Sequence, residues 1–378
     1  MPGNGFIKKV FADIDNVPAA LGQVHFPSLD GLRGIAILMV VLSHLKYSHL
    51  YLYDVVFNGK LGVIIFFVLS GFLITTLCIK EKVITSDISL KKFYLRRLLR
   101  IFPVAYLFIL VIVILNLIFH LQVDYINIIG AVFYLMNFSS FFRKYHSSVY
   151  TGHFWSLAVE EQFYLIVPFI LKKDFKLYLL LILFIVFLLP FAIALQYRFP
   201  VLDNFILTAF THYLIKFQAI GVGCLFSVFV FKFPLNNKLA KSKVFTNLLA
   251  IFLIGYIQYD NLFTVKDIFS GLIISFLIGF IIISNIVPAK DFIFKILNSK
   301  ILSVTGILSY SIYIWQQLFT SKDYRLPNFM VASPYNVICL IIVSCLSYYF
   351  YESFFLRLKS KFSLTQKITP ELKAEPVA

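Results

Sequence analysis

The feature that most constrains this chain is a series of long apolar runs, which begins at residue 29 and continues to residue 356. Each run is about 17 to 25 residues long, enough for a helix to cross a hydrocarbon layer of ~30 Å. Hydrophobic residues make up 60% of the chain and charged residues 14%, and the mean hydropathy is +0.88. A soluble globule is therefore excluded. The sequence predicts an all-α fold, a polytopic transmembrane helical bundle.

Positive charge sets the expected topology. The segment at 125–142 is short, carries Asn127 and Asn137, and follows the preceding run almost without a loop. If it does not cross, most of the 34 lysines and arginines fall on one side of the membrane; if it does cross, the bias disappears. We therefore expect a multi-pass protein of the cell (inner) membrane with both termini cytosolic. The ten expected spans lie at 29–50, 59–79, 98–121, 154–171, 177–197, 204–231, 244–260, 267–288, 302–320 and 334–356, with residues 125–142 re-entrant or at the outer face.

The pattern predicts one membrane domain at residues 26–357, between a cytosolic arm at 1–25 and a cytosolic tail at 358–378. All four cysteines fall in apolar segments, where they behave as small hydrophobes, so neither a disulfide framework nor a metal site is predicted. The net charge of +16 does not indicate a nucleic-acid partner, because the cations lie in short loops between apolar runs. The expected partner is the lipid bilayer.

Ionisable groups inside the apolar runs are the main functional candidates, since each costs at least ~2.5 kcal/mol in a membrane. Arg33 and His44 are eleven residues apart, so they share one helix face ~16 Å apart along the axis. With the expected topology, Arg33 lies near the inner surface and His44 in the outer half. The alternatives are a snorkelling cation for Arg33 and a hydrogen-bonded interior histidine for His44.

The stretch WSLAVEEQFY places Glu160 and Glu161 in another expected span. Glu160 would lie ~9 Å from the outer end, at a depth comparable with His44. A carboxylate beside His44 would orient the imidazole as a general base for a hydroxyl. The alternative is a buried ion pair with Arg33 or Lys216. The residues predicted to bind the substrate are Trp155, Gln162, Tyr164 and Ser70; small residues such as Ser70 and Gly71 also favour close helix packing.

The stretch KKFYLRRLLRIFP places Arg96, Arg97 and Arg100 at a cytosolic helix entry. Guanidinium groups match phosphate geometry, so this cluster is a candidate for binding the phosphates of a cofactor. Anchoring by positive residues on the inner side produces the same pattern, and that alternative stays open.

Together these motifs resemble the membrane-bound acyltransferase 3 family. The resemblance rests on Arg33 and His44, then FFVLSGF, RRLLRIFP and HFWSLAVEEQFYLIVP in that order, over about residues 26–357. It implies catalytic roles for Arg33, His44 and Glu160, phosphate contacts for Arg97 and Arg100, and a role for Trp155. It also implies acyl-CoA, usually acetyl-CoA, as the cytosolic donor and extracytoplasmic sugars as acceptors. One departure is Gln316, where many relatives have a histidine.

The resulting expectation is an integral membrane O-acyltransferase, in the first place an O-acetyltransferase. It would move an acyl group from cytosolic acyl-CoA to a hydroxyl of an extracytoplasmic glycan or glycolipid, such as a polysaccharide or lipopolysaccharide, either directly or through a covalent acyl-enzyme. The alternative from another class is a proton-coupled transporter or flippase that uses His44, Glu160 and Lys216 as a proton relay. A receptor or scaffold is a third possibility.

Overall fold

The structure is a computed structural model, which describes residues 3–23, 25–45, 51–141, 148–199, 205–233, 243–260 and 268–362. Most of the tail expected at 358–378 lies outside these ranges. The described ranges contain helices and no strand, which confirms the all-α prediction. In chain order the helices are α1 (Gly3–Phe11), η1 (Ala19–Leu21), α2 (Pro27–Leu45), α3 (Tyr51–Val56), α4 (Gly59–Thr85), α5 (Leu90–Phe119), α6 (Tyr125–Val132), η2 (Met136–Phe141), α7 (Phe154–Lys173), α8 (Phe175–Leu183), η3 (Phe184–Leu188), α9 (Leu189–Arg198), α10 (Phe205–Leu214), η5 (Ile215–Phe217), α11 (Gln218–Lys232), α12 (Lys243–Asp260), α13 (Ile268–Asn285), α14 (Phe292–Leu297), α15 (Lys300–Thr320), α16 (Asn328–Val331), α17 (Tyr335–Leu346), η7 (Ser347–Glu352) and α18 (Ser353–Ser360).

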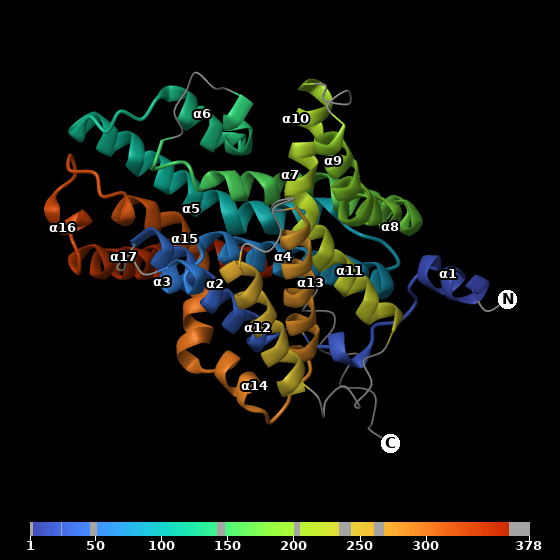
Figure 1. The fold of residues 1–378 in the computed structure, drawn as a ribbon. Helices are drawn as coiled ribbons and strands as arrows, with labels where there is room; N and C mark the ends of the chain where they lie inside the picture. The colour runs from blue at the N-terminus through green and yellow to red at the C-terminus, as the bar shows by residue number, and fades with distance from the viewer. Residues whose placement is uncertain are drawn as a thin grey trace. The chain divides into compact units, whose positions relative to one another are not determined.

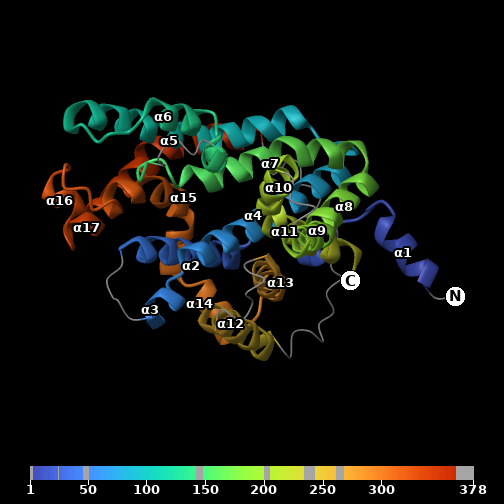
Figure 2. The ribbon, with the colours of Figure 1, turned by 45° about the horizontal axis from the view of Figure 1, so that its top comes forward.

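Seven helical stretches among the described residues are long and apolar enough to cross a membrane, so the protein is a multi-pass membrane protein. They are Pro27–Leu45, Tyr51–Thr85, Leu90–Phe119, Phe154–Lys173, Phe175–Gln196, Thr208–Lys232 and Tyr335–Ser360. Two shorter apolar helices, Lys243–Tyr259 and Phe269–Asn285, lie side by side in both views (Figures 1 and 2). The more polar α15 corresponds to the ninth expected span, 302–320.

The segment expected not to cross is broken into short pieces. α6 has eight residues, a length of ~12 Å, and it is followed by a turn and the 3-10 helix η2. Neither piece could span a hydrocarbon layer of ~30 Å.

The helices group into two compact units that alternate along the chain. Unit 1 contains residues 1–86 and 159–309, and unit 2 contains residues 87–158 and 310–378. The single membrane domain expected at 26–357 stays a prediction. The boundary between the units falls inside α7, after Ala158, and inside α15, after Ser309.

In unit 1, α2 and α4 pack against each other in antiparallel directions. A side chain at Gly59 would lie 2.3 Å from Ser43 Oγ, and one at Gly62 would lie 2.6 Å from Ala36 O. At the other end, Lys80 Nζ donates to Gln23 O at 2.8 Å. The start of α4 therefore lies beside the end of α2, and the end of α4 lies beside the start of α2.

On another face, α4 packs closely on α11. A Cβ at Gly71 would lie 1.9 Å from Ile220 O, and a Cβ at Gly223 would lie 2.0 Å from Val68 O. Only glycines allow two helix backbones to approach this closely. A hydroxyl pair between Thr76 and Ser227, at 2.8 Å, joins the same two helices.

In unit 2, α5 is the longest helix and packs against α6 and α18. The Arg96 guanidinium donates to Phe362 O at 2.9 Å, just beyond the end of α18. The hydroxyl of Tyr310, in the part of α15 that belongs to this unit, donates to Ile101 O. Ser311 Oγ donates to Glu352 Oε2 at 2.6 Å and thereby joins α15 to η7.

Candidate active site

The first turn of α2 holds a chain of charged groups within unit 1. The Asp30 carboxylate accepts from His25 Nε2 at 2.5 Å through Oδ2 and from Arg33 at 2.7 Å through Oδ1. The Asp30 side chain is only 6% exposed, whereas that of Arg33 is 28% and that of His25 is 62% exposed. A buried carboxylate therefore holds two accessible cationic or polar side chains in fixed positions.

Packing of the backbone makes this turn rigid. A Cβ at Gly31 would lie 1.9 Å from Leu297 O, and one at Gly306 would lie 1.8 Å from Asp30 O. Ser28 Oγ also donates to Asn285 O at 2.6 Å. The turn that carries Asp30 is thus locked against α13, α14 and the start of α15.

His44 lies near the other end of α2 and is half-buried. Its Nδ1 lies 2.7 Å from Val40 O and 3.4 Å from Ser43 Oγ, and these are its recorded hydrogen bonds among the described residues. Since only a protonated nitrogen can donate to a carbonyl, Nδ1 carries the hydrogen and Nε2 of a neutral ring is left as an acceptor. An acceptor nitrogen of this kind is suited to removing a proton from a hydroxyl.

Glu160 of α7 is held by a residue of α4. Ser70 Oγ donates to Glu160 Oε1 at 2.7 Å, and both side chains are half-buried. Ser70 lies eleven residues after Gly59, so it is ~16 Å further along α4 but only ~20° around its axis. On α4, Ser70 lies between Gly62, which packs on Ala36 of α2, and Lys80, which bonds to Gln23 just before α2. Ser70 is therefore level with the first turns of α2.

Glu160 therefore lies at the level of Arg33, about three helical turns from the level of His44. A direct contact between His44 and Glu160 stays a prediction. Helical periodicity places Arg33, His44 and Asp30 within ~60° of one another on α2. Asp30, Arg33 and His44 form a polar stripe. Arg33 and His44 are half-buried, whereas Asp30 and apolar neighbours such as Ala36, Ile37 and Val40 are buried.

The residues predicted to bind the substrate differ in accessibility. Gln162 is half-buried and its Oε1 accepts from Tyr213 OH at 3.2 Å, a contact between α7 and α10 in unit 1. Tyr164 is only 2% exposed, so a substrate contact there would require a change of structure. Trp155, in unit 2, is 37% exposed and stays a candidate.

The three predicted phosphate-binding arginines are all in unit 2, on α5, but their surroundings differ. Arg96 is bound to Phe362 O, so one of its functions is structural. The Arg97 guanidinium lies 6.0 Å from the centre of the Phe93 ring. The charge of Arg100 acts on the buried carboxylate of Glu352, and so does the charge of Lys359. Arg97 and Arg100 remain the candidates for an anionic ligand.

An aromatic cluster surrounds the start of α7 in unit 2. Phe108 contacts His153, Phe154 and Trp315, with ring centres 5.4, 6.0 and 5.5 Å away. Next to Trp315, Gln316 is completely buried, and neither its Nε2 nor its Oε1 has a hydrogen-bond partner among the described residues. The residue that departs from the family pattern is thus an unsatisfied amide inside unit 2.

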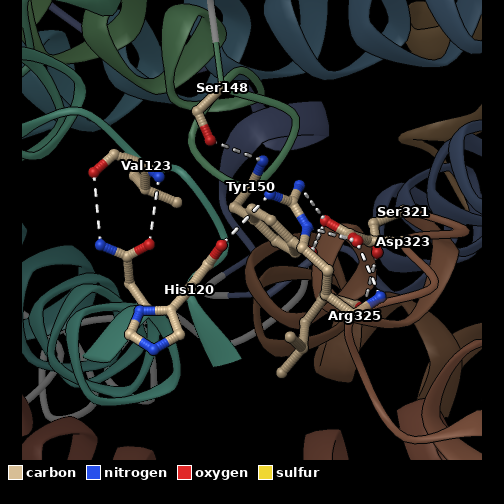
Figure 3. Close-up of polar contacts among 9 residues, drawn as sticks. His120, Val123, Ser148, Tyr150, Ser321, Asp323 and Arg325 are labelled. Atoms are coloured by element: carbon tan, nitrogen blue, oxygen red, sulfur yellow. Dashed lines mark hydrogen bonds and ion pairs between the residues drawn. The ribbon is translucent and has the colours of Figure 1, made fainter. Parts of the chain in front are cut away.

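Figure 3 shows a polar cluster that joins three loops of unit 2. Asp323 accepts from Tyr150 OH at 2.7 Å and from Arg325 at 2.8 and 2.7 Å, and Arg325 also donates to His120 O at 3.2 Å. Hydrogen bonding from Arg325 lowers the pKa of Asp323 from 3.8 to about 2. Burial, together with the bond to Asp323, raises the pKa of Tyr150. All these groups are paired, so the cluster orders the loops.

Sequence reasoning missed His25 and Asp323. His25 falls in the segment interpreted as an arm, although its position five residues before an aspartate in a helical first turn is a local signal. Nothing in the sequence pairs Asp323 with Tyr150, because they are far apart along the chain. No group of three or more His, Cys, Asp or Glu residues in the described ranges is arranged to hold a metal ion.

Comparisons with known proteins show which family the chain resembles. The model of a family described as an acyltransferase domain matches residues 26–353. The O-acetyltransferase OatA of Staphylococcus aureus strain NCTC 8325 is 30% identical over 311 residues, which is 77% of this chain and 50% of the relative. A protein of S. aureus strain COL, provisionally named an O-acetyltransferase, is 39% identical over 171 residues, 40% of this chain and 27% of the relative. The chain spans half the length, or less, of these curated relatives. No solved structure matches it.

Proposed function

We propose a reaction for this chain from one premise: the chain belongs to the acyltransferase family whose domain model it matches. It is therefore an acyltransferase embedded in a membrane. We infer that it is an O-acetyltransferase that takes the acetyl group from cytosolic acetyl-CoA and transfers it to a hydroxyl of an extracytoplasmic glycan or glycolipid. The names of its relatives in S. aureus support O-acetyl transfer.

The observation that carries this proposal is the arrangement of polar groups in unit 1. The stripe on α2 runs from Asp30 through Arg33 to His44, and Ser70 fixes the Glu160 carboxylate at the level of Arg33. Such groups are costly within a membrane helix bundle, and they line a substrate path more readily than they stabilise a fold. With the expected topology, in which both termini are cytosolic, the stripe leads from the donor side towards the acceptor side.

In the proposed reaction, the acceptor hydroxyl gives its proton to Nε2 of His44 and its oxygen attacks the thioester carbon. A C–O bond forms, the C–S bond breaks, and the CoA thiolate leaves and is protonated. Glu160 and Arg33, about three helical turns from the level of His44, are proposed to line the path by which the donor reaches His44. The predicted phosphate-binding residues, Arg97 and Arg100, keep that role in the proposal.

The test uses the purified full chain in detergent with acetyl-CoA and an acceptor oligosaccharide. We expect release of the CoA thiol, together with an acetyl mass added to the acceptor. Replacing the proposed general base in His44→Ala should lower the rate by ~100-fold or more. His120→Asn is the matched control, because the His120 side chain is exposed and asparagine also tolerates the left-handed backbone found there, φ 51°.

Two results would overturn the proposal. One is the absence of both thiol release and acetylated product, as expected of a transporter. The other is full activity in His44→Ala. Mass spectrometry of surface glycans from cells with and without the protein identifies the acceptor by the loss of an acetyl mass.

A further inference from the structure

The first helix, α1, has no part in the reaction described so far. It lies beside α8 in unit 1 (Figures 1 and 2). Just after α1, the carbonyls of Ala12 and Asp13 accept from Lys232 Nζ at 2.5 and 3.1 Å. The charges of Asp13 and Asp15 act on the same ammonium group, which lies 5.2 Å from the centre of the Phe175 ring. Lys232 ends one membrane-spanning stretch and Phe175 begins another, so α1 is held at the edge of the bilayer.

The side chains of α1 are divided into an apolar and a basic group. Ile7, Val10 and Phe11 lie within ~100° of one another around the helix, and Lys8 and Lys9 lie outside that sector. Both lysines are exposed, and Ile7 is 58% exposed, so unit 1 leaves this end of the apolar face uncovered. A helix of this kind at a bilayer edge places its apolar face among the acyl chains and its lysines among the headgroups.

Further lysines lie at the same edge of unit 1. Lys173 and Lys176 flank the start of α8 and are exposed. The charges of Lys176 and Lys82, which is near the end of α4, both act on Asp174. The Asp174 carboxylate accepts from the backbone N–H groups of Lys176 and Leu177 at 2.6 and 3.0 Å, so its first function is to cap α8. These lysines and those of α1 form a basic rim, which consists of Lys8, Lys9, Lys82, Lys173 and Lys176.

We propose that the basic rim binds the phosphate groups of anionic phospholipids, while the apolar face of α1 enters the region of their acyl chains. Clusters of about four to eight basic residues beside a membrane-spanning helix attract anionic headgroups in this way. A dissolved phosphate ion would engage only the lysines, whereas a phospholipid also covers Ile7. The inference goes beyond the proposed reaction, because no residue of the rim belongs to the proposed site.

Binding is measured by native mass spectrometry of the full chain, titrated with phosphatidylglycerol or with phosphatidylcholine. We expect Lys8→Gln/Lys9→Gln to weaken the binding of phosphatidylglycerol about 10-fold and to leave that of phosphatidylcholine unchanged. Lys290→Gln/Lys295→Gln is the matched control, because it removes two charges from exposed lysines elsewhere in unit 1. The control should keep the affinity of the wild type.

Insertion is measured separately, in a background without the four native cysteines. A fluorophore on Ile7→Cys should be quenched by phospholipids that carry a spin label on the acyl chain. The same fluorophore on Asn16→Cys, an exposed position beyond α1, should be quenched much less. Equal quenching at the two positions, or none at Ile7→Cys, would overturn the insertion of the apolar face.

The binding experiment has its own contrary outcomes. Equal affinity in the wild type and Lys8→Gln/Lys9→Gln, or an equal loss in both double variants, would overturn the basic rim as a site. Full displacement of phosphatidylglycerol by inorganic phosphate would assign the site to a dissolved anion instead. The melting temperature in detergent and thiol release from acetyl-CoA should be the same in the wild type and Lys8→Gln/Lys9→Gln. If the wild type releases no thiol, the proposed function fails and this inference stands.

Discussion

At the scale of single residues, the candidate site depends on how each polar side chain is held. The Glu160 carboxylate accepts from the hydroxyl of Ser70 at 2.7 Å. His25 is set by Asp30, and Arg33 is set by the same carboxylate. Glu160, His25 and Arg33 thus each have a partner that fixes the direction of the side chain, and removal of a partner should alter activity more than stability.

Ser70→Ala tests this directly. Without the hydroxyl, Glu160 loses a hydrogen bond worth ~1.5 kcal/mol and its orientation, so we expect kcat to fall about 10-fold. Ser275→Ala is the control, because Ser275 lies in the same unit but donates to Gly271 O within its own helix. Thiol release from acetyl-CoA measures both variants. Equal activity in Ser70→Ala and the wild type would show that Ser70 does not position Glu160.

Gln316 gives a prediction about stability. A completely buried amide without partners costs ~1–3 kcal/mol, so Gln316→Met should raise the melting temperature in detergent. The neighbouring Gln317 accepts from Thr320 Oγ1 at 3.3 Å, and Gln317→Met should bring no such gain. A lower melting temperature in Gln316→Met would mean that the amide is satisfied in the folded protein.

At the scale of elements, close contacts between helices decide where the side chains lie. The contact of α4 with α11 at Gly71 and Gly223 fixes α4 and, with it, the adjacent Ser70. In unit 2, the loops around Asp323 depend on charge instead (Figure 3). The contact of α4 with α11 is steric and should not depend on pH. The contacts of Asp323 are electrostatic and should depend on pH.

Gly71→Ala should be severely destabilising. The added methyl would lie 1.9 Å from Ile220 O, a backbone atom that cannot turn aside, so we expect a loss of about 3 kcal/mol or more. Gly255→Ala is the matched control, since no atom lies within 4 Å of its Cβ position. Alanine there should stabilise α12 by up to ~1 kcal/mol. Melting temperatures compare the two, and equal values would mean that α4 and α11 can separate without cost.

The Asp323 cluster should weaken in acid. The pKa of Asp323 is about 2 in the folded chain, below its ordinary value of 3.8, so the carboxylate contributes stability that is complete above pH ~4 and is lost as the pH falls towards 2. Asp323→Asn should therefore lower the melting temperature by a constant amount from pH 7 to pH 5, and by less at pH 3. A difference that stays constant down to pH 3 would contradict the ion pair with Arg325.

At the scale of the whole molecule, the prediction concerns topology. Tyr324 is 90% exposed in a loop expected outside, and Lys176 is exposed in a loop expected inside. In a background without the four native cysteines, Tyr324→Cys should react with a membrane-impermeant maleimide in intact cells. Lys176→Cys should react only after the cells are opened. Labelling of Lys176→Cys in intact cells would mean that the orientation in the membrane is opposite to the expected one. The donor side would then be opposite as well.

The sequence by itself determined the all-α class, the positions of the helices and the shared face of Arg33 and His44. These follow from hydrophobic run length and helical periodicity, which are local properties of the chain. It also identified the family, because the motifs occur in order along the chain. The tertiary structure alone decided that Ser70 holds Glu160, that Asp30 holds His25, and that Asp323 joins Tyr150 to Arg325. Whether two side chains on different helices form a hydrogen bond depends on which helix faces meet and on how far one helix is shifted along the other. The local periodicity of the sequence gives no information about that shift.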